Sequence, residues 1–156
     1  MRQPTKTHGW ELTGRAQPHA RVALGAGYSL LRGSFDGDED GSLESDLGAA
    51  DIGPDRLNLT LDLDPGRRFS GRLQSFSYFD RAFQDGAGEE QARFDGYTTV
   101  DASLSAALGA STITFAVSNL LDEQYITYFG QAATDLADRY FAGRGRTFTL
   151  RLATGF

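Results

Sequence analysis

Residues 56–64 read RLNLTLDLD: every second side chain from residue 57 to residue 63 is leucine, and the side chains between them are polar or charged. Successive side chains of a β-strand point to opposite faces, so this spacing predicts a strand with one apolar and one polar face. The strand is followed at once by a tight turn, because Asp64-Pro65-Gly66 has turn chemistry.

The same period of two recurs along the chain, in residues 20–31, 100–108, 112–118 and 147–156. Two weaker candidates for strands are Trp10–Ala16 and Phe69–Tyr78. The sequence therefore predicts an all-β chain of about seven strands of about ten residues each, in an antiparallel up-and-down meander with next to no helix.

The alternation also predicts which side chains share a face of the sheet. We expect ten apolar side chains on one face: Leu57, Leu59, Leu61, Leu63, Ile113, Phe115, Val117, Phe148, Leu150 and Leu152. We expect the opposite face to carry polar side chains at the intervening positions: Thr112, Thr114, Thr147, Thr149 and Arg151.

Short and long connections alternate between these strands. The short ones fall at residues 18–19, 64–66 and 109–110, and the long ones at residues 33–54, 82–96 and 122–143. Fifteen of the 21 acidic residues lie in the three long connections. Compact soluble domains rarely need such loops, whereas transmembrane β-barrels have short turns on one side and long loops on the other. A soluble antiparallel meander is the alternative, since its strands alternate too.

Composition excludes several classes of function. A length of 156 residues predicts one domain, and a net charge of −6 argues against a nucleic-acid partner. The chain has no cysteine and two histidines, and it has no phosphate loop or hydrolase motif, so we expect no enzymatic activity and no cofactor. Residues 1–17 lack the apolar run of a signal peptide. Residues 102–121 are uncharged but too polar for a membrane helix.

Seven strands are an odd number and too few to close around a lumen, whereas single-chain bacterial barrels have an even number of strands. We therefore expect part of a larger transmembrane β-barrel, whose apolar face meets lipid and whose polar face meets the lumen.

The C-terminal third carries a family resemblance. The segment NLLDEQYIT at residues 119–127 resembles the penultimate strand of TonB-dependent outer-membrane receptors, and RYFAGRGRTFTL at residues 139–150 resembles their last strand. GWEL at residues 9–12 and YTTVD at residues 97–101 are similar to upstream strands of the family. The residues that match the family pattern, in structural roles, are Asn119, Leu120, Asp122, Tyr125, Gly145, Arg146 and the terminal aromatic Phe156.

This resemblance implies a plugged barrel of 22 strands in the bacterial outer membrane, driven by the inner-membrane TonB complex. The implied function is energy-coupled uptake of a scarce nutrient, with a ferric siderophore expected. The implied partners are outer-membrane lipid, the remaining strands and the plug, the TonB complex through a missing N-terminal part, and the barrel assembly machinery through Phe156. Because plug, coupling box and signal peptide are absent, we expect residues 1–156 to be the C-terminal part of a receptor. The alternatives are a soluble β-meander binding module and a small structural barrel formed by several copies.

One acidic segment resembles a calcium-binding loop. DGDEDGSLE at residues 36–44 places Asp36, Asp38, Asp40 and Glu44 at ligand positions of such a loop, but Leu47 stands where a chelating glutamate belongs. We interpret the segment mainly as a solvated acidic loop, so no metal is expected. Calcium binding is the alternative.

Two further groups of residues invite a functional interpretation. Arg144 and Arg146 could contact phosphate or lipopolysaccharide, but a glycine-bent strand start is the favoured interpretation. Six aromatic residues near the expected strand ends suit an interfacial girdle, although they would also fill a soluble core: Trp10, Tyr28, Tyr78, Tyr97, Tyr125 and Tyr128.

Overall fold

A computed structural model describes residues 4–48, 50–66, 68–132 and 141–155. The strands are β1 (Thr5–His19), β2 (Val22–Phe35), β3 (Ser45–Asp46), β4 (Arg56–Gly66), β5 (Phe69–Tyr78), β6 (Arg81–Gln84), β7 (Glu90–Phe94), β8 (Tyr97–Leu108), β9 (Ser111–Ser118) and β10 (Thr147–Thr154). One helix is described, α1 (Tyr128–Ala132), and it is five residues long.

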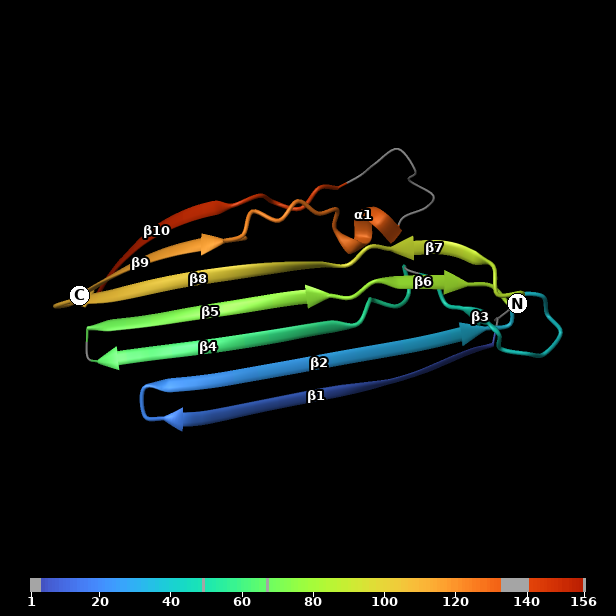
Figure 1. The fold of residues 1–156 in the computed structure, drawn as a ribbon, viewed down its shortest axis with the longest axis horizontal. Helices are drawn as coiled ribbons and strands as arrows, with labels where there is room; N and C mark the ends of the chain where they lie inside the picture. The colour runs from blue at the N-terminus through green and yellow to red at the C-terminus, as the bar shows by residue number, and fades with distance from the viewer. Residues whose placement is uncertain (1–3, 49, 67, 133–140, 156) are drawn as a thin grey trace.

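Seven of these strands form one curved antiparallel sheet in the order β1-β2-β4-β5-β8-β9-β10, and β3 pairs with the end of β2 (Figure 1). The order follows the chain, so the predicted up-and-down meander is confirmed. The two-residue turns at residues 20–21 and 109–110 lie at one end of the sheet, where β4 also meets β5. The long connections lie at the opposite end, which we call the loop end.

Two expectations about strand extent need correction. The connection at residues 82–96 is not structureless, because β6 and β7 within it form a separate antiparallel hairpin. β1 spans Thr5–His19 rather than Trp10–Ala16, since its polar flanks Lys6 and His8 keep their pairing with β2. A search for apolar alternation misses such polar strand ends.

The register of the sheet places all ten predicted apolar side chains on one surface, which we call the apolar face. Leu57, Leu59, Leu61 and Leu63 lie in register with the even-numbered residues of β2 from Tyr28 to Val22, and Leu150 lies opposite Phe115. The five predicted polar positions alternate with them in β9 and β10 and so share the other surface, the polar face.

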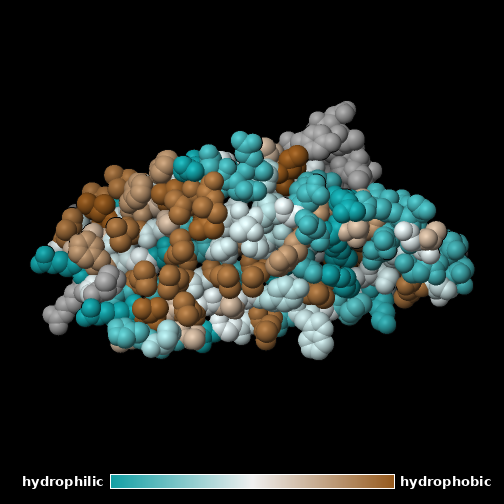
Figure 2. All heavy atoms as spheres, in the orientation of Figure 1, coloured by the Kyte–Doolittle hydropathy of each residue, from teal (hydrophilic) through white to brown (hydrophobic). Residues whose placement is uncertain are grey.

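The apolar face is largely uncovered by protein. Phe148, Leu150 and Leu152 are 64%, 76% and 68% exposed, and Trp10 on β1 is 79% exposed. Val117 is the exception among the ten, because it is buried. Figure 2 shows hydrophobic side chains gathered over the strands toward the short-turn end and hydrophilic ones over the loop end. A soluble domain would bury such a face, so the uncovered leucines count against the soluble alternative.

The buried apolar residues lie mainly at the loop end instead of beneath the sheet. Ile52, Phe83 and Phe94 are 2%, 3% and 1% exposed; Ile52 belongs to the connection at residues 33–54, and the two phenylalanines belong to the β6–β7 hairpin. Within the part of the chain that the structure describes, no helix has the length and apolarity needed to cross a membrane.

Candidate functional site

The polar face carries a small charge cluster near the short-turn end. Asp62 of β4 accepts a 2.6 Å hydrogen bond from Nε of Arg72 on β5, and Arg15 of β1 reaches the same carboxylate at 3.9 Å. One step further along the face, Gln74 donates to Asn58 at 3.2 Å. These side chains come from β1, β4 and β5, with β2 between the first two, so the polar face is cross-linked by polar contacts that the alternating sequence alone does not specify.

At the loop end, an ion pair ties β2 to the start of β4. Arg32 donates to both oxygens of Asp55, at 2.5 and 2.8 Å. This hydrogen-bonded guanidinium holds the pKa of Asp55 below its ordinary value, although partial burial acts in the opposite direction. Bidentate contacts between arginine and a carboxylate add geometric specificity as well as electrostatic stabilisation.

The loop end also has an open pocket of about 960 Å³ between the connection at residues 33–54 and the β6–β7 hairpin. Its walls include Phe35 and Phe83 but also five carboxylates, from Asp38, Glu44, Asp46, Asp51 and Asp85. No basic side chain is among the described residues that line it. The pocket is therefore negatively charged, which disfavours anions.

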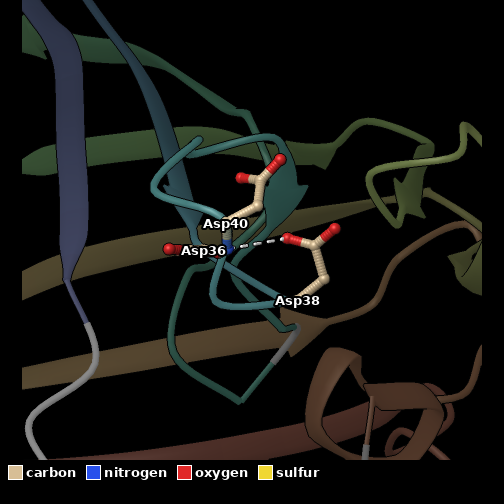
Figure 3. Close-up of side chains that lie close together, drawn as sticks. All are labelled: Asp36, Asp38 and Asp40. Atoms are coloured by element: carbon tan, nitrogen blue, oxygen red, sulfur yellow. Dashed lines mark hydrogen bonds between the residues drawn. The ribbon is translucent and has the colours of Figure 1, made fainter.

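Three of the four residues of the calcium-like loop come together. Oxygen atoms of Asp36, Asp38 and Asp40 lie within 4.8 Å of one another (Figure 3). Each carboxylate also accepts a backbone N–H of its own loop: Asp36 from Gly41 at 2.9 Å, Asp38 from Asp40 at 3.3 Å, and Asp40 from Ser42 at 2.7 Å. These hydrogen bonds shape the loop whether or not a cation is bound.

Glu44 does not join this group. Its side chain lies against Gly86 of the hairpin, where a β-carbon would overlap it, and its pKa is raised by desolvation and by the nearby aspartates. Leu47, at the position of the chelating glutamate, packs toward Gly33 and donates its backbone N–H to the Gly33 carbonyl at 2.8 Å. The structure therefore keeps two of the expected ligand positions away from the three aspartates.

Asn119 joins β9 to its neighbours on both sides. It is 4% exposed and has a left-handed backbone with φ of 51°. Its backbone N–H donates to Asp101 of β8 at 2.8 Å, and its side-chain amide donates to the carbonyls of Glu123 at 2.9 Å and Arg144 at 3.2 Å. The side-chain oxygen accepts the N–H of Glu123 at 2.9 Å.

Asp122 and Gly145 extend this junction. Asp122 has φ of 58° and accepts the backbone N–H of Arg146 at 2.9 Å, and Gly145 lies beside the same carboxylate. Leu120 donates its N–H to Val100 of β8 at 2.6 Å. We call Asn119, Asp122 and their partners in β8 and residues 144–146 the β9 junction. Arg144 and Arg146 contribute backbone groups here, and their side chains are exposed. Phe156 lies outside the described residues.

The predicted aromatic girdle is only partly correct. Trp10 and Tyr28 lie on the apolar face, but Tyr78 and Tyr97, paired across β5 and β8, lie at polar-face positions. Tyr125 stacks on Tyr97 with ring centroids 4.1 Å apart. The register decides this outcome, because residues of β5 and β8 alternate between the two faces.

Gly143 permits the position of the Tyr125 ring. A β-carbon at residue 143 would overlap that ring, and the Gly143 N–H donates to the Tyr125 carbonyl at 2.8 Å. Tyr128, the sixth aromatic residue, lies in α1 at the loop end, where its ring packs edge-on against Phe94. Four of the six predicted girdle residues thus have other surroundings.

Sequence reasoning also missed Arg81 and Gln131. Arg81 is 8% exposed and donates to the carbonyls of Leu31 at 3.0 Å and Gly53 at 3.4 Å. Gln131 bonds both backbone groups of Asp95 at 2.9 Å. Neither residue lies in a motif, and their partners are 28 to 50 residues away for Arg81 and 36 for Gln131. No local pattern could have identified them.

Comparison with known proteins bears on the sheet as a whole. The family model described as "TonB dependent receptor-like, beta-barrel" matches residues 3–120. The ferric aerobactin receptors of Escherichia coli and Klebsiella pneumoniae are each 37% identical over 98 residues, which is 56% of this chain and 12% of each receptor. The β9 junction beyond residue 120 lies outside the family match.

Three solved structures share the fold. The copper transporter OprC superposes on 97% of this chain with a TM-score of 0.76 and 17% identity, covering 23% of its own chain. The closed form of the ferric-catecholate import receptor Fiu from Escherichia coli covers 99% of this chain and 21% of its own, with a TM-score of 0.70 and 21% identity. The ferric yersiniabactin uptake receptor FyuA from Yersinia pestis covers 96% of this chain and 23% of its own, with a TM-score of 0.68 and 21% identity. The chain spans less than a quarter of the length of these relatives.

Proposed function

Because the chain belongs to the TonB-dependent receptor β-barrel family, we propose that residues 1–156 form C-terminal strands of an outer-membrane receptor for energy-coupled nutrient uptake. The observation that carries the proposal is the sheet itself: the family match covers strands whose apolar face is left uncovered by protein. Lipid is the environment in which such a face is stable, since closed barrels present their apolar side chains to the bilayer.

We propose a ferric siderophore as the transported ligand. Three of the relatives are named as receptors for ferric chelates: ferric aerobactin, ferric catecholate and ferric yersiniabactin. OprC is named as a copper transporter, so copper is the competing cargo. The match to the aerobactin receptors supports iron over copper as the cargo, because its sequence identity is 37%, whereas the structural neighbours share 17–21%.

The partners that we propose for this chain are those that membership of the family implies. The polar face would surround a plug, the two edges of the sheet would pair with further strands, and the inner-membrane TonB complex would act through a part of the receptor outside these residues. We also propose that Phe156 contacts the barrel assembly machinery. Polar-face side chains such as Arg72 and Gln74 offer the hydrogen-bonding groups that a plug needs.

The test is iron-limited growth of cells that carry or lack the gene encoding this chain. We expect the deletion to abolish growth on ferric aerobactin or on a ferric catecholate supplied as the sole iron source, and uptake to require an energised TonB complex. Growth that is unaffected on every ferric chelate, together with lost copper accumulation, would identify a copper transporter instead. Membrane fractionation with antibodies against residues 85–91 checks the location: recovery in the soluble fraction would contradict the proposal.

A further inference from the structure

The three long connections meet at the loop end, although they are far apart in the sequence (Figure 1). We define the loop cap as residues 45–48, 50–55, 81–94 and 126–131. The buried side chains Ile52, Phe83 and Phe94 lie in its first two connections, and Tyr128 of the third packs on Phe94 with ring centroids 4.9 Å apart. The cap therefore has an apolar core, which also contacts Tyr78 of β5 and Tyr97 of β8 at the end of the sheet.

Arg81 joins the hairpin to β2 and to the connection at residues 33–54. Its Nη1 donates to the carbonyls of Leu31 and Gly53, and its guanidinium lies 4.6 Å from the ring centroid of Phe83. Arg81 is only 8% exposed, so water does not reach its charge freely, and this burial lowers the pKa of Arg81. A buried cation keeps such a position only while its acceptors stay in place, so movement of Gly53 would expose a costly unpaired charge.

Tyr128 and Gln131 join the third connection to the other two. The Tyr128 hydroxyl donates to the carbonyl of Ile52, and burial raises the pKa of Tyr128 to about 12, so the hydroxyl remains a donor at neutral pH. Gln131 bonds the N–H and the carbonyl of Asp95, next to β7, at 2.9 Å. On the opposite side of the cap, the N–H of Gln84 donates to Asp46 at 3.0 Å.

We propose that these contacts make the loop cap a single latched unit, in which the three connections open together and not one at a time. Separate surface loops open locally at little cost and independently of one another. Here each connection supplies hydrogen-bond or packing partners to another connection of the cap, so loosening one connection removes partners of the rest. The proposal concerns the motion of the cap and is independent of which ligand the receptor carries.

Amide hydrogen exchange tests the latch. The protein is prepared in outer-membrane vesicles, so that any strands that complete the sheet are present. Tyr128→Phe removes one hydroxyl and keeps the ring. We expect exchange to rise roughly fivefold, the factor for one lost net hydrogen bond, at amides of all three connections. The reporting amides are Leu47 in the connection at residues 33–54, Asp85 in the hairpin and Gln131 in the connection at residues 122–143, each of which donates to a backbone carbonyl.

Arg81→Met is the reciprocal variant, because it removes the charge at the hairpin. Its effect is measured as the exchange rate of the Gln131 amide in the connection at residues 122–143, which should also rise. Tyr125→Phe is the matched control: its ring stacks on Tyr97, its hydroxyl makes none of the cap contacts, and it should leave cap exchange unchanged. Amides of β4 and β5 serve as the internal standard for an intact sheet. A rise confined to the connection that carries the substitution, or no rise in any of them, would overturn the proposal.

Discussion

The carboxylate of Asp122 accepts the backbone N–H of Arg146 at 2.9 Å, across a separation of 24 residues. This bond and the contacts of Asn119 hold the start of β10 against the end of β9. Asn119 and Asp122 have left-handed backbones, which Asn and Asp tolerate better than most other residues. The family-like motif at residues 119–125 therefore acts here as a joint between strands.

Asn119→Ala should destabilise the barrel by about 2–3 kcal/mol, because it removes three hydrogen bonds that the buried Asn119 side chain makes to the backbone of Glu123 and Arg144. The measurement is the free energy of unfolding in urea, in liposomes. Asn58→Ala is the control: among the described residues its side chain hydrogen-bonds Gln74 alone, so the variant should lose about 1 kcal/mol or less. Equal losses in the two variants would refute the importance of the β9 junction.

Gly143→Ala should cost roughly 1–3 kcal/mol, because its β-carbon would overlap the rigid ring of Tyr125. Gly145→Ala is the matched control, where a β-carbon would meet only an ordinary contact with Asp122. Adding Tyr125→Ala to Gly143→Ala should recover part of the loss, and a double-mutant cycle measures that coupling. Strict additivity would show that the two residues do not clash.

Leu150→Arg should destabilise the membrane-inserted barrel by roughly 2–4 kcal/mol, because Leu150 lies on the apolar face near the middle of β10. Thr149→Arg places the same charge on the polar face and should be nearly neutral. Heat-modifiable gel mobility over a urea series gives both values. The opposite ranking would reverse the assignment of the two faces.

The Arg32–Asp55 ion pair should resist acid. Since the folded pKa of Asp55 is depressed, its stabilisation is fully present above the unfolded pKa of about 3.9 and is lost only as the pH falls through the lower folded value. The difference in unfolding free energy between wild type and Asp55→Asn should therefore be constant from pH 7 to about 5 and shrink below about 4. A difference that already shrinks at pH 6 would contradict the depressed pKa.

Residues 1–156 expressed alone should not give a stable monomer. In the described residues, β1 and β10 each pair with a single neighbour, so each offers an open edge. Unpaired backbone groups in hydrocarbon each cost several kcal/mol. We expect aggregation or edge-to-edge oligomers by size-exclusion chromatography in detergent. A monodisperse, heat-modifiable monomer that binds ferric aerobactin would show that the chain is self-sufficient.

Local alternation was sufficient to predict the main sheet. Leu57 and Leu63 belong to one unbroken alternating run, and the structure places both on the apolar face. The β6–β7 hairpin escaped prediction because its strands are short: β6, with the buried side chains of Arg81 and Phe83, is only four residues long. A run that short cannot be told from a loop by its period.

The candidate site was less predictable, since it depends on contacts between distant segments. Asp36, Asp38 and Asp40 lie close together as their spacing suggested, but Glu44 turns toward Gly86 in another connection. The tyrosines show the same limit: a position near an expected strand end suggested Tyr97 for an interfacial girdle, but only the register with Tyr78 assigns it to the polar face.

The placement of the short turns at one end of the sheet has a consequence for the order of folding. β1 and β2 are joined by residues 20–21, and β8 and β9 by residues 109–110, so the first cross-strand contacts close very small loops. Closing a chain segment costs entropy that grows with its length, and local pairs form fastest. Each hairpin should form its cross-strand hydrogen bonds in order from its turn toward the loop end, and the first few residue pairs should fix its register. The connections at residues 36–55 and 81–94 should then be the last to find one another.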